Sequence, residues 1–389
     1  MLTAQIHPTQ RGIRCCQVEA VPAKGFAIGE QLAPAGAHAQ PSMRRAPRGE
    51  GPTVTRYAEL HCLSNLSFLR GVSSATELFG RAAELGYEAL AITDECSVAG
   101  IVRALQAAEA SGIKLIVGTE LRLDDGAKVV LLASDMPAYA ALSRIITSAR
   151  GRAAKGSYLA SWDDLARGTP GLLVLLVATD RCGHVEPAAP AWASALAITC
   201  PGRGWLAIEL HRGDEDQAAL VDLLRLGDDH GLRCLAAGDV HMHARGRRAL
   251  QDTVTAIRHG KTLAEVAGEL YVNGERHLRS VEELARLYPP ELLEEAAAVA
   301  ARCSLDLRQL GYHHPHDVVP LGQDPKAWLA YLVERGARRR WPAGVPSAIA
   351  AQIARELDLI SELGYGAFFL TVHDIVRFAR SRGILCQGR

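Results

Sequence analysis

The sequence predicts an α/β fold: seven strands that alternate with helices and curl into a closed or nearly closed barrel, followed by an all-helical segment. Short apolar runs recur from residue 57 to residue 241, and Ala/Leu-rich stretches of helical length lie between most of them. Alternation at this spacing is typical of parallel β/α units. Beyond residue 310 the strand pattern stops. A doubly wound open sheet is the competing arrangement.

The predicted strands are the apolar runs at 57–62, 88–94, 113–121, 128–134, 172–179, 205–211 and 232–241. The helices between them are predicted at 75–86, 98–111, 137–150 and 215–230. A further helical stretch covers 281–310, a loop follows at 311–325, and helices are expected at 326–341, 347–363 and 371–382. Because this last part has no strands, residues 56–310 and 325–389 are predicted to be different domains.

Composition limits the class of protein. With 389 residues the chain suggests two or three domains, and 48% apolar and 22% charged residues are the balance of a soluble globular protein. Since 43 basic residues match 43 acidic ones, any nucleic-acid-binding surface must be a local patch. The longest apolar run, Leu172–Ala178, is far shorter than the ~20 residues of a membrane helix.

Cysteine usage and the amino-terminal region indicate where the chain works. Nine scattered cysteines without a CxxC pair, and no apolar signal core at the start, favour a reducing, cytoplasmic location without disulfides. Residues 1–55 are rich in Gly, Pro, Ala and Gln and lack any strand or helix period. We interpret them as a disordered tail, because they offer little apolar surface to offset chain entropy.

Polar side chains follow several of the predicted strands at the point where each strand ends. In a β/α barrel the strand ends and the loops after them form one mouth, where active sites lie. Imidazole and carboxylate groups are ligands for zinc, manganese or magnesium. The sequence therefore predicts a candidate metal site at this mouth. Its members are His61, Asp94, Glu120, His211, Asp239 and His241, with Glu95 and Lys128 beside them.

Each of these residues also has a structural interpretation. Asp94 follows Thr93 and precedes a helix, so it could cap that helix. His211 could be a loop histidine with satisfied hydrogen bonds, and His61 alone could be a core residue. Asp239 and His241 are the most persuasive pair, because alternate strand residues point the same way. Two other groups are interpreted structurally: Asp214 to Asp216 as a helix start, and the tract His313, His314 and His316 as a linker.

The stretches YAELHCLSNLSFLRG (57–71), ALAITDECSVAG (89–100) and IKLIVGTEL (113–121) resemble the opening of the PHP (polymerase and histidinol phosphatase) domain. The resemblance is to the error-prone branch of the bacterial C-family DNA polymerases, relatives of the polymerase III alpha subunit. It continues through residues 209–217, 235–243 and 277–295, and through 356–389, where CQGR (386–389) leads in that family into the palm. It covers about residues 56–389 and implies a PHP-type distorted (β/α)7 barrel followed by the first thumb and palm helices.

The resemblance also implies an altered metal site. Where the family has an H-x-H motif, this chain has His61, Cys62 and Leu63, so the second histidine is lost. Arg70 stands where an acid is common, Glu95 where a histidine follows Asp94, and Lys128 where metal-binding relatives have a histidine. Since arginine and lysine only donate and carry positive charge, we expect no zinc or manganese here. We expect Arg70 and Lys128 to replace the ions by pairing with Glu120, Asp239 or Glu95.

For function, the resemblance implies an error-prone, translesion-type DNA polymerase that acts in DNA repair and replication. Its partners would be DNA and deoxynucleotides, with other mutagenesis proteins and the sliding clamp as further partners, and no membrane. In that family the carboxylates that hold Mg²⁺ for nucleotidyl transfer lie beyond CQGR, so this chain alone is expected to be inactive. The alternative is a stand-alone metal-dependent PHP phosphoesterase.

Arginines cluster in the predicted carboxyl-terminal helices. One group is Arg335 and Arg338–Arg340, and it can be a solvated helix face. The other is the candidate DNA contact, because it approaches the palm by resemblance and guanidinium groups suit bidentate phosphate binding. Its members are Arg377, Arg380, Arg382 and Arg389.

Overall fold

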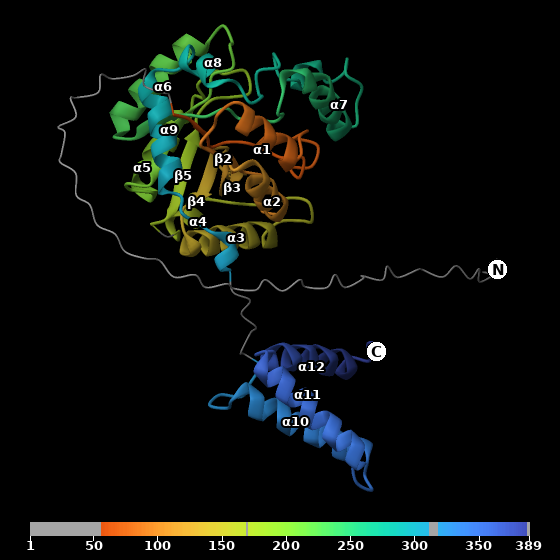
Figure 1. Ribbon diagram of the computed structural model, residues 1–389. Helices are drawn as coiled ribbons and strands as arrows, with labels where there is room; N and C mark the ends of the chain where they lie inside the picture. The colour runs from red at the N-terminus through yellow and green to blue at the C-terminus, as the bar shows by residue number, and fades with distance from the viewer. Residues whose placement is uncertain (1–55, 169, 311–317, 387–389) are drawn as a thin grey trace, which may run out of the picture. The chain divides into compact units, whose positions relative to one another are not determined.

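The computed structural model describes residues 56–168, 170–310 and 318–386. The predicted tail over 1–55, the histidine tract at 313–316 and Arg389 lie outside these described residues. Figure 1 shows the strands and helices of the barrel region and the helices of the carboxyl-terminal part.

A single seven-stranded sheet forms the centre of residues 56–310, and its strands follow one another in sequence order. They are β1 (Ala58–Glu59), β2 (Ala89–Ile92), β3 (Lys114–Arg122), β4 (Lys128–Ala133), β5 (Leu172–Val177), β6 (Gly204–Ile208) and β7 (Arg233–Ala236). All seven lie within or beside the runs predicted from the sequence. The long apolar run of β5 is buried at every position, as expected for a strand covered on both faces.

The alternation predicts parallel β/α units, and one strand departs from them: β4 runs antiparallel to both β3 and β5. The reason is the length of the connection. Only Leu123–Ala127 separates β3 from β4, and the amide of Leu123 donates to the carbonyl of Ala127 at 2.8 Å. A parallel return needs a crossover of a dozen or more residues, so this short turn forces the chain to reverse.

The sheet curls until the segments that follow its first and last strands meet. Cys62 and Val240 form a parallel bridge. The amide of Leu63 donates to the Val240 carbonyl at 2.8 Å, and the amide of Val240 donates to the His61 carbonyl at 2.9 Å. These bonds confirm the predicted barrel over the open sheet, and they place the residues after β1 directly beside those after β7.

Helices cover the outside of the curled sheet (Figure 1). Four match predicted segments: α1 (Ala75–Glu84), α2 (Ile101–Ser111), α3 (Met136–Gly151) and α6 (Asp216–His230). The sequence analysis did not predict α4 (Trp162–Ala166), α5 (Ala189–Thr199) or α7 (Arg248–His259). The region ends with α8 (Val281–Ala285) and α9 (Pro290–Arg302). Ser74 and Glu77 form a reciprocal capping box at α1, which satisfies two backbone donors there.

Three helices form the carboxyl-terminal part: α10 (Pro325–Arg340), α11 (Ser347–Glu362) and α12 (Gly366–Ser381), with α10 packed on α12. This agrees with the all-helical segment predicted from the sequence. In the part of the chain that the structure describes, no single helix has the length and hydropathy of a membrane span. Only α11 and α12 taken together pass such a test, and they are bent by 115° relative to each other.

Two glycines give matched tests of this packing. Gly118 lies on β3, where an added Cβ would stand 2.6 Å from the backbone oxygen of Leu131, whereas a Cβ at Gly80 on α1 would meet nothing within 4 Å. We expect Gly118→Ala to lower the free energy of unfolding by about 1–3 kcal/mol through overpacking. Gly80→Ala should raise it by up to about 1 kcal/mol through helix propensity. Urea unfolding measures the stability of both variants. If the two substitutions changed it equally, Gly118 would not be tightly packed against β4.

Candidate functional site

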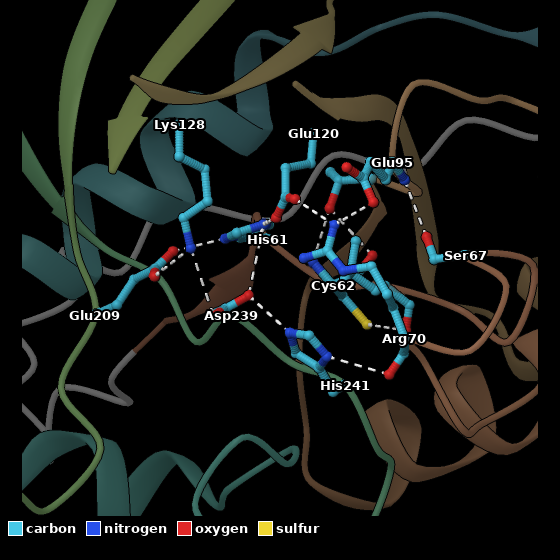
Figure 2. Close-up of polar contacts among 12 residues, drawn as sticks. His61, Cys62, Ser67, Arg70, Glu95, Glu120, Lys128, Glu209, Asp239 and His241 are labelled. Carbon is cyan, nitrogen blue, oxygen red and sulfur yellow. Dashed lines mark hydrogen bonds and ion pairs between the residues drawn. The ribbon is translucent and has the colours of Figure 1, made fainter. Parts of the chain in front are cut away.

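Four buried side chains meet where the strands of the barrel end (Figure 2). His61 follows β1, Glu120 lies near the end of β3, Glu209 follows β6 and Asp239 follows β7. None of them is more than 3% exposed. The barrel closure described above brings His61 and Asp239 together, and the neighbouring strands deliver the two glutamates. This group is called the rim cluster below, together with the cations that contact it: Arg70, Lys128 and Arg276.

His61 is the centre of the rim cluster. Its Nδ1 lies 2.6 Å from Glu209 Oε1, and its Nε2 lies 2.9 Å from Glu120 Oε2 and 3.7 Å from Asp239 Oδ1. Burial alone would lower the pKa of His61, but the charges of Glu209 and Asp239 and the hydrogen bonds to Glu120 and Glu209 outweigh it and raise the pKa to about 10. His61 is therefore an imidazolium at neutral pH, and both ring nitrogens donate.

Two of the predicted substitutions in the site act as cations toward these acids. Arg70 Nη1 lies 2.6 Å from both Glu120 Oε1 and Glu95 Oε2. Lys128 Nζ lies 3.6 Å from both Glu209 Oε2 and Asp239 Oδ2. The pairing of Arg70 and Lys128 with acids of the site, predicted from the sequence, is present in the structure. Burial opposes ionisation of Lys128, but Asp239 and Glu209 raise its pKa above the ordinary value.

Asp239 receives further cationic and polar contacts. Arg276 Nε lies 3.0 Å from Asp239 Oδ2, and its guanidinium lies over the ring of Tyr271 at 4.1 Å. His241 Nε2 lies 3.1 Å from Asp239 Oδ1. Burial would raise the pKa of Asp239, but Lys128, His241 and Arg276 hold it well below its usual range. Asp239 also adopts a left-handed backbone with φ of 43°, a conformation that costs of order 1–3 kcal/mol.

The charges of this group balance. The four acids Glu95, Glu120, Glu209 and Asp239 face four cations: His61, Arg70, Lys128 and Arg276. A buried carboxylate costs several kcal/mol unless it is paired and hydrogen-bonded. The side chains of the protein itself therefore neutralise the acids, and no added ion is needed to do so.

Ligand geometry alone would allow a metal ion, because one ligand atom each from His61, Glu120 and Asp239 lies within 4.8 Å of the others. The occupied contacts argue against it. His61 already donates through both nitrogens, and Arg70, Lys128 and Arg276 hold the carboxylate oxygens. Two unit charges ~4 Å apart repel by about 4 kcal/mol at an effective dielectric near 20, and a divalent ion doubles this. The residues present do not fit a divalent ion.

Three predicted site residues lie outside the rim cluster. Asp94 turns toward the loop after β1, where it accepts hydrogen bonds from the Ser64 amide and hydroxyl and from the Ser67 hydroxyl. His211 Nε2 lies 3.0 Å from the Gly238 carbonyl, and burial together with Arg276 and Arg279 keeps its pKa well below the ordinary value. Leu63 is fully buried. Glu95, in contrast, joins the cluster through Arg70 and accepts from the Tyr158 hydroxyl at 2.9 Å.

The sequence analysis missed Glu209 and Arg276. A signal for Glu209 was present, because an acid stands two residues before a histidine at the ends of three strands: Glu59 and His61, Glu209 and His211, Asp239 and His241. Glu59 and Asp239 flank the barrel closure, where the Glu59 carboxylate accepts from the amides of His61 and Gly238, each at 2.9 Å. Arg276 lies in a loop beyond α7, where no strand or helix period marks it.

Sequence comparisons match two separate parts of the chain. The PHP domain family model matches residues 59–199, and the model described as the bacterial DNA polymerase III alpha NTPase domain matches residues 327–389. Proteins named error-prone DNA polymerase are similar over most of the chain. The one from Pseudomonas fluorescens is 55% identical over 86% of this chain, and the one from Dechloromonas aromatica is 49% identical over 87%. The chain spans about a third of their length, 32% and 33% respectively.

Among solved structures, the chain is similar to an amidohydrolase from Chromobacterium violaceum that was determined with bound sulfate and no metal. The two are 18% identical, with a TM-score of 0.38, and the match covers 48% of this chain and 87% of that one.

Protonation of His61 makes the stability of the barrel depend on pH. A folded pKa of about 10 against an ordinary value of 6.5 means that, between these values, the folded state holds a proton that the unfolded state has released. The free energy of unfolding should therefore fall as pH rises through this window, by up to about 1.4 kcal/mol per pH unit. Urea unfolding from pH 6 to pH 10 measures the slope.

The matched variant is His61→Gln, which should be less stable near neutral pH and show a flatter profile in the same window. His230→Gln on α6 serves as the control, because His230 contacts only the backbone of its own helix. A wild-type profile with the same slope as that of His61→Gln would show that His61 is not the protonated centre of the cluster.

Proposed function

We propose that this chain, which carries a PHP domain and a polymerase III alpha segment, is the amino-terminal part of an error-prone DNA polymerase. The observation that carries the proposal is the 55% identity to a protein of that name across 86% of the chain, which includes both matched regions. In the whole enzyme, template-directed addition of deoxynucleotides would take place during synthesis across DNA damage.

The chain by itself is proposed to lack nucleotidyl transfer. It spans 32% of the length of the Pseudomonas relative, and the resemblance implies that the palm carboxylates that hold Mg²⁺ follow residue 389. The partners of the whole enzyme would be DNA and deoxynucleotides, with other mutagenesis proteins and the sliding clamp as further candidates. Such an enzyme would work in the cytoplasm.

The barrel is proposed to have a supporting role instead of a hydrolytic one. A phosphoesterase of this fold would need a metal ion to supply a hydroxide nucleophile. Here Arg70, Lys128 and Arg276 occupy the acids that would hold the ion. The cavity beside the cluster has a volume of about 210 Å³, below the range of about 300–1,000 Å³ of small-molecule sites. These contacts disfavour the alternative of a stand-alone phosphoesterase.

The carboxyl-terminal helices are proposed to face DNA. Arg377, Arg380 and Arg382 lie on or next to the last turns of α12. Arg377 pairs with Asp374 on the same helix, and the guanidinium of Arg382 lies over the ring of Phe378 at 5.3 Å. The helix is exposed at these positions, so its guanidinium groups can reach phosphates, although a phosphate would have to displace Asp374 from Arg377.

Primer extension tests the polymerase proposal. The open reading frame should continue in frame past codon 389, and its full product should extend a primed template in the presence of Mg²⁺. The 389-residue chain alone should not. In the full product, Arg377→Ala/Arg380→Ala should weaken DNA binding and reduce its dependence on salt, because fewer counterions are released. A stop codon directly after codon 389, or extension by the chain alone, would contradict the proposal.

A second test addresses the cations of the rim cluster. Lys128→Met leaves the four acids facing three cations, so one buried negative charge is uncompensated and the free energy of unfolding should fall by about 3–5 kcal/mol. Millimolar Mn²⁺ should restore part of this loss in the variant only, since an added cation can then replace the ammonium group. Urea unfolding with and without Mn²⁺ measures both effects.

The matched control for that experiment is Lys155→Met, because Lys155 is exposed. Its stability should change by less than about 0.5 kcal/mol, with no response to Mn²⁺. Equal stabilisation of the wild type and of Lys128→Met by Mn²⁺ would show that the unaltered cluster takes up the ion, and would favour the phosphoesterase.

A further inference from the structure

A second group of ligand-type side chains lies in the turn that follows β5, beside the cavity that the rim cluster also lines. Asp180, Cys182 and His184 each place one ligand atom within 4.8 Å of the other two. Cys182 is exposed, and the side chains of His184 and Asp180 are 59% and 36% exposed. Nothing in the polymerase proposal uses these residues.

The turn holds the backbone of the three residues and the Asp180 carboxylate in a fixed arrangement. Asp180 Oδ1 accepts from the amides of Cys182 at 2.8 Å and His184 at 2.9 Å. The Asp180 amide in turn donates to the His184 carbonyl at 2.9 Å, and a bridge between Thr179 and Val185 closes the base of the turn. Gly183, with φ of 95°, supplies the left-handed residue between the two ligands. Binding an ion here would cost little additional ordering of the backbone.

The chemistry of the three groups selects the ion. A thiolate and an imidazole are preferred ligands of Zn²⁺, whereas Mg²⁺ and Ca²⁺ prefer oxygen. With the Cys182 thiol deprotonated and His184 neutral, the ligands carry two negative charges, which match a divalent ion. The one cation inside the turn, Arg181, pairs with Glu269. The contrast with the rim cluster is direct, since there the protein's own cations hold the acids.

A carboxylate from another element lies near the turn. Asp216 Oδ1, at the start of α6, is 3.8 Å from the position that a Cβ on Gly183 would take. The other oxygen of this carboxylate accepts from the Arg212 amide at 2.7 Å, which fixes the orientation of the group. The carboxylate of Asp216 thus comes from a different element and stands beside the turn.

We propose that Asp180, Cys182 and His184 bind one Zn²⁺ ion, with water or Asp216 in the remaining position. Binding releases the thiol proton of Cys182 to solvent and replaces the contact between His184 Nδ1 and Asp180 Oδ2, now 3.3 Å apart. The site is independent of the polymerase activity, so it stands or fails on its own test. It also predicts where zinc is found in the purified protein: on the turn, not in the rim cluster.

Metal titration of the full chain, purified without a histidine tag and stripped with chelator, tests the proposal. Zn²⁺ added in competition with a chromophoric chelator should bind with one equivalent per chain. Co²⁺ in its place should give a thiolate-to-metal charge-transfer band. Cys182→Ser should abolish this band, and both Cys182→Ser and His184→Gln should weaken Zn²⁺ binding by at least about tenfold, since even outer-shell changes cost 10–100-fold. Both positions are exposed, so the variants should fold, and circular dichroism checks this.

Three controls separate this site from other ligands in the chain. Cys234→Ser and the triple variant of His313, His314 and His316 to Gln should bind zinc as the wild type does. His61→Gln reports on the rim cluster and should also keep the single equivalent. Absence of stoichiometric zinc from the wild type would overturn the proposal. So would binding that survives Cys182→Ser and His184→Gln, or binding lost in the triple histidine variant or in His61→Gln.

Discussion

The barrel depends on one electrostatic constraint: acids that converge at the ends of its strands must be neutralised out of contact with water. Glu120, Glu209 and Asp239 are each no more than 3% exposed, and isolated buried carboxylates are too costly to persist. The protein meets this constraint with His61, Arg70, Lys128 and Arg276. Such a group contributes little net stability when complete, because desolvation offsets attraction. The loss of one partner, however, leaves a charge that nothing else can solvate.

The closure of the sheet is what makes the group possible. The backbone bonds between the segments after β1 and β7 set His61 beside Asp239. Glu59 holds this junction from within by accepting from the amides of His61 and Gly238. A Cβ on Gly238 would stand 2.4 Å from the Glu59 carboxylate, so a side chain there would displace this carboxylate from the junction. Backbone closure and charge pairing thus depend on the same few residues.

Much of this arrangement could be predicted from the sequence, because the ends of strands in a barrel share one mouth. That rule placed His61, Glu120, Asp239 and His241 beside one another, and the resemblance to the PHP family, together with the charge of the two side chains, indicated the roles of Arg70 and Lys128. It could not separate Asp94 and His211 from the group, since their direction depends on hydrogen bonds to Ser64, Ser67 and Gly238. The sequence analysis did not predict the reversal at β4, because it assigned the strands from their apolar residues and did not consider how short the connection between β3 and β4 is. Arg276 lies in a loop, where no strand or helix periodicity indicates which way a side chain points.

Replacing a metal ion by fixed cations changes what a site can do. A bound ion can leave, exchange ligands and acidify a water molecule, whereas an ammonium or guanidinium group keeps the acids neutralised and supplies no nucleophile. The cations also remain with the chain at any metal concentration, whereas occupancy by an ion depends on its supply. That independence suits a domain whose proposed task is to support a polymerase whose own chemistry needs Mg²⁺. In the rim cluster, Arg70, Lys128 and Arg276 supply the positive charge that a metal ion would supply, but they cannot acidify a water molecule as a metal ion can.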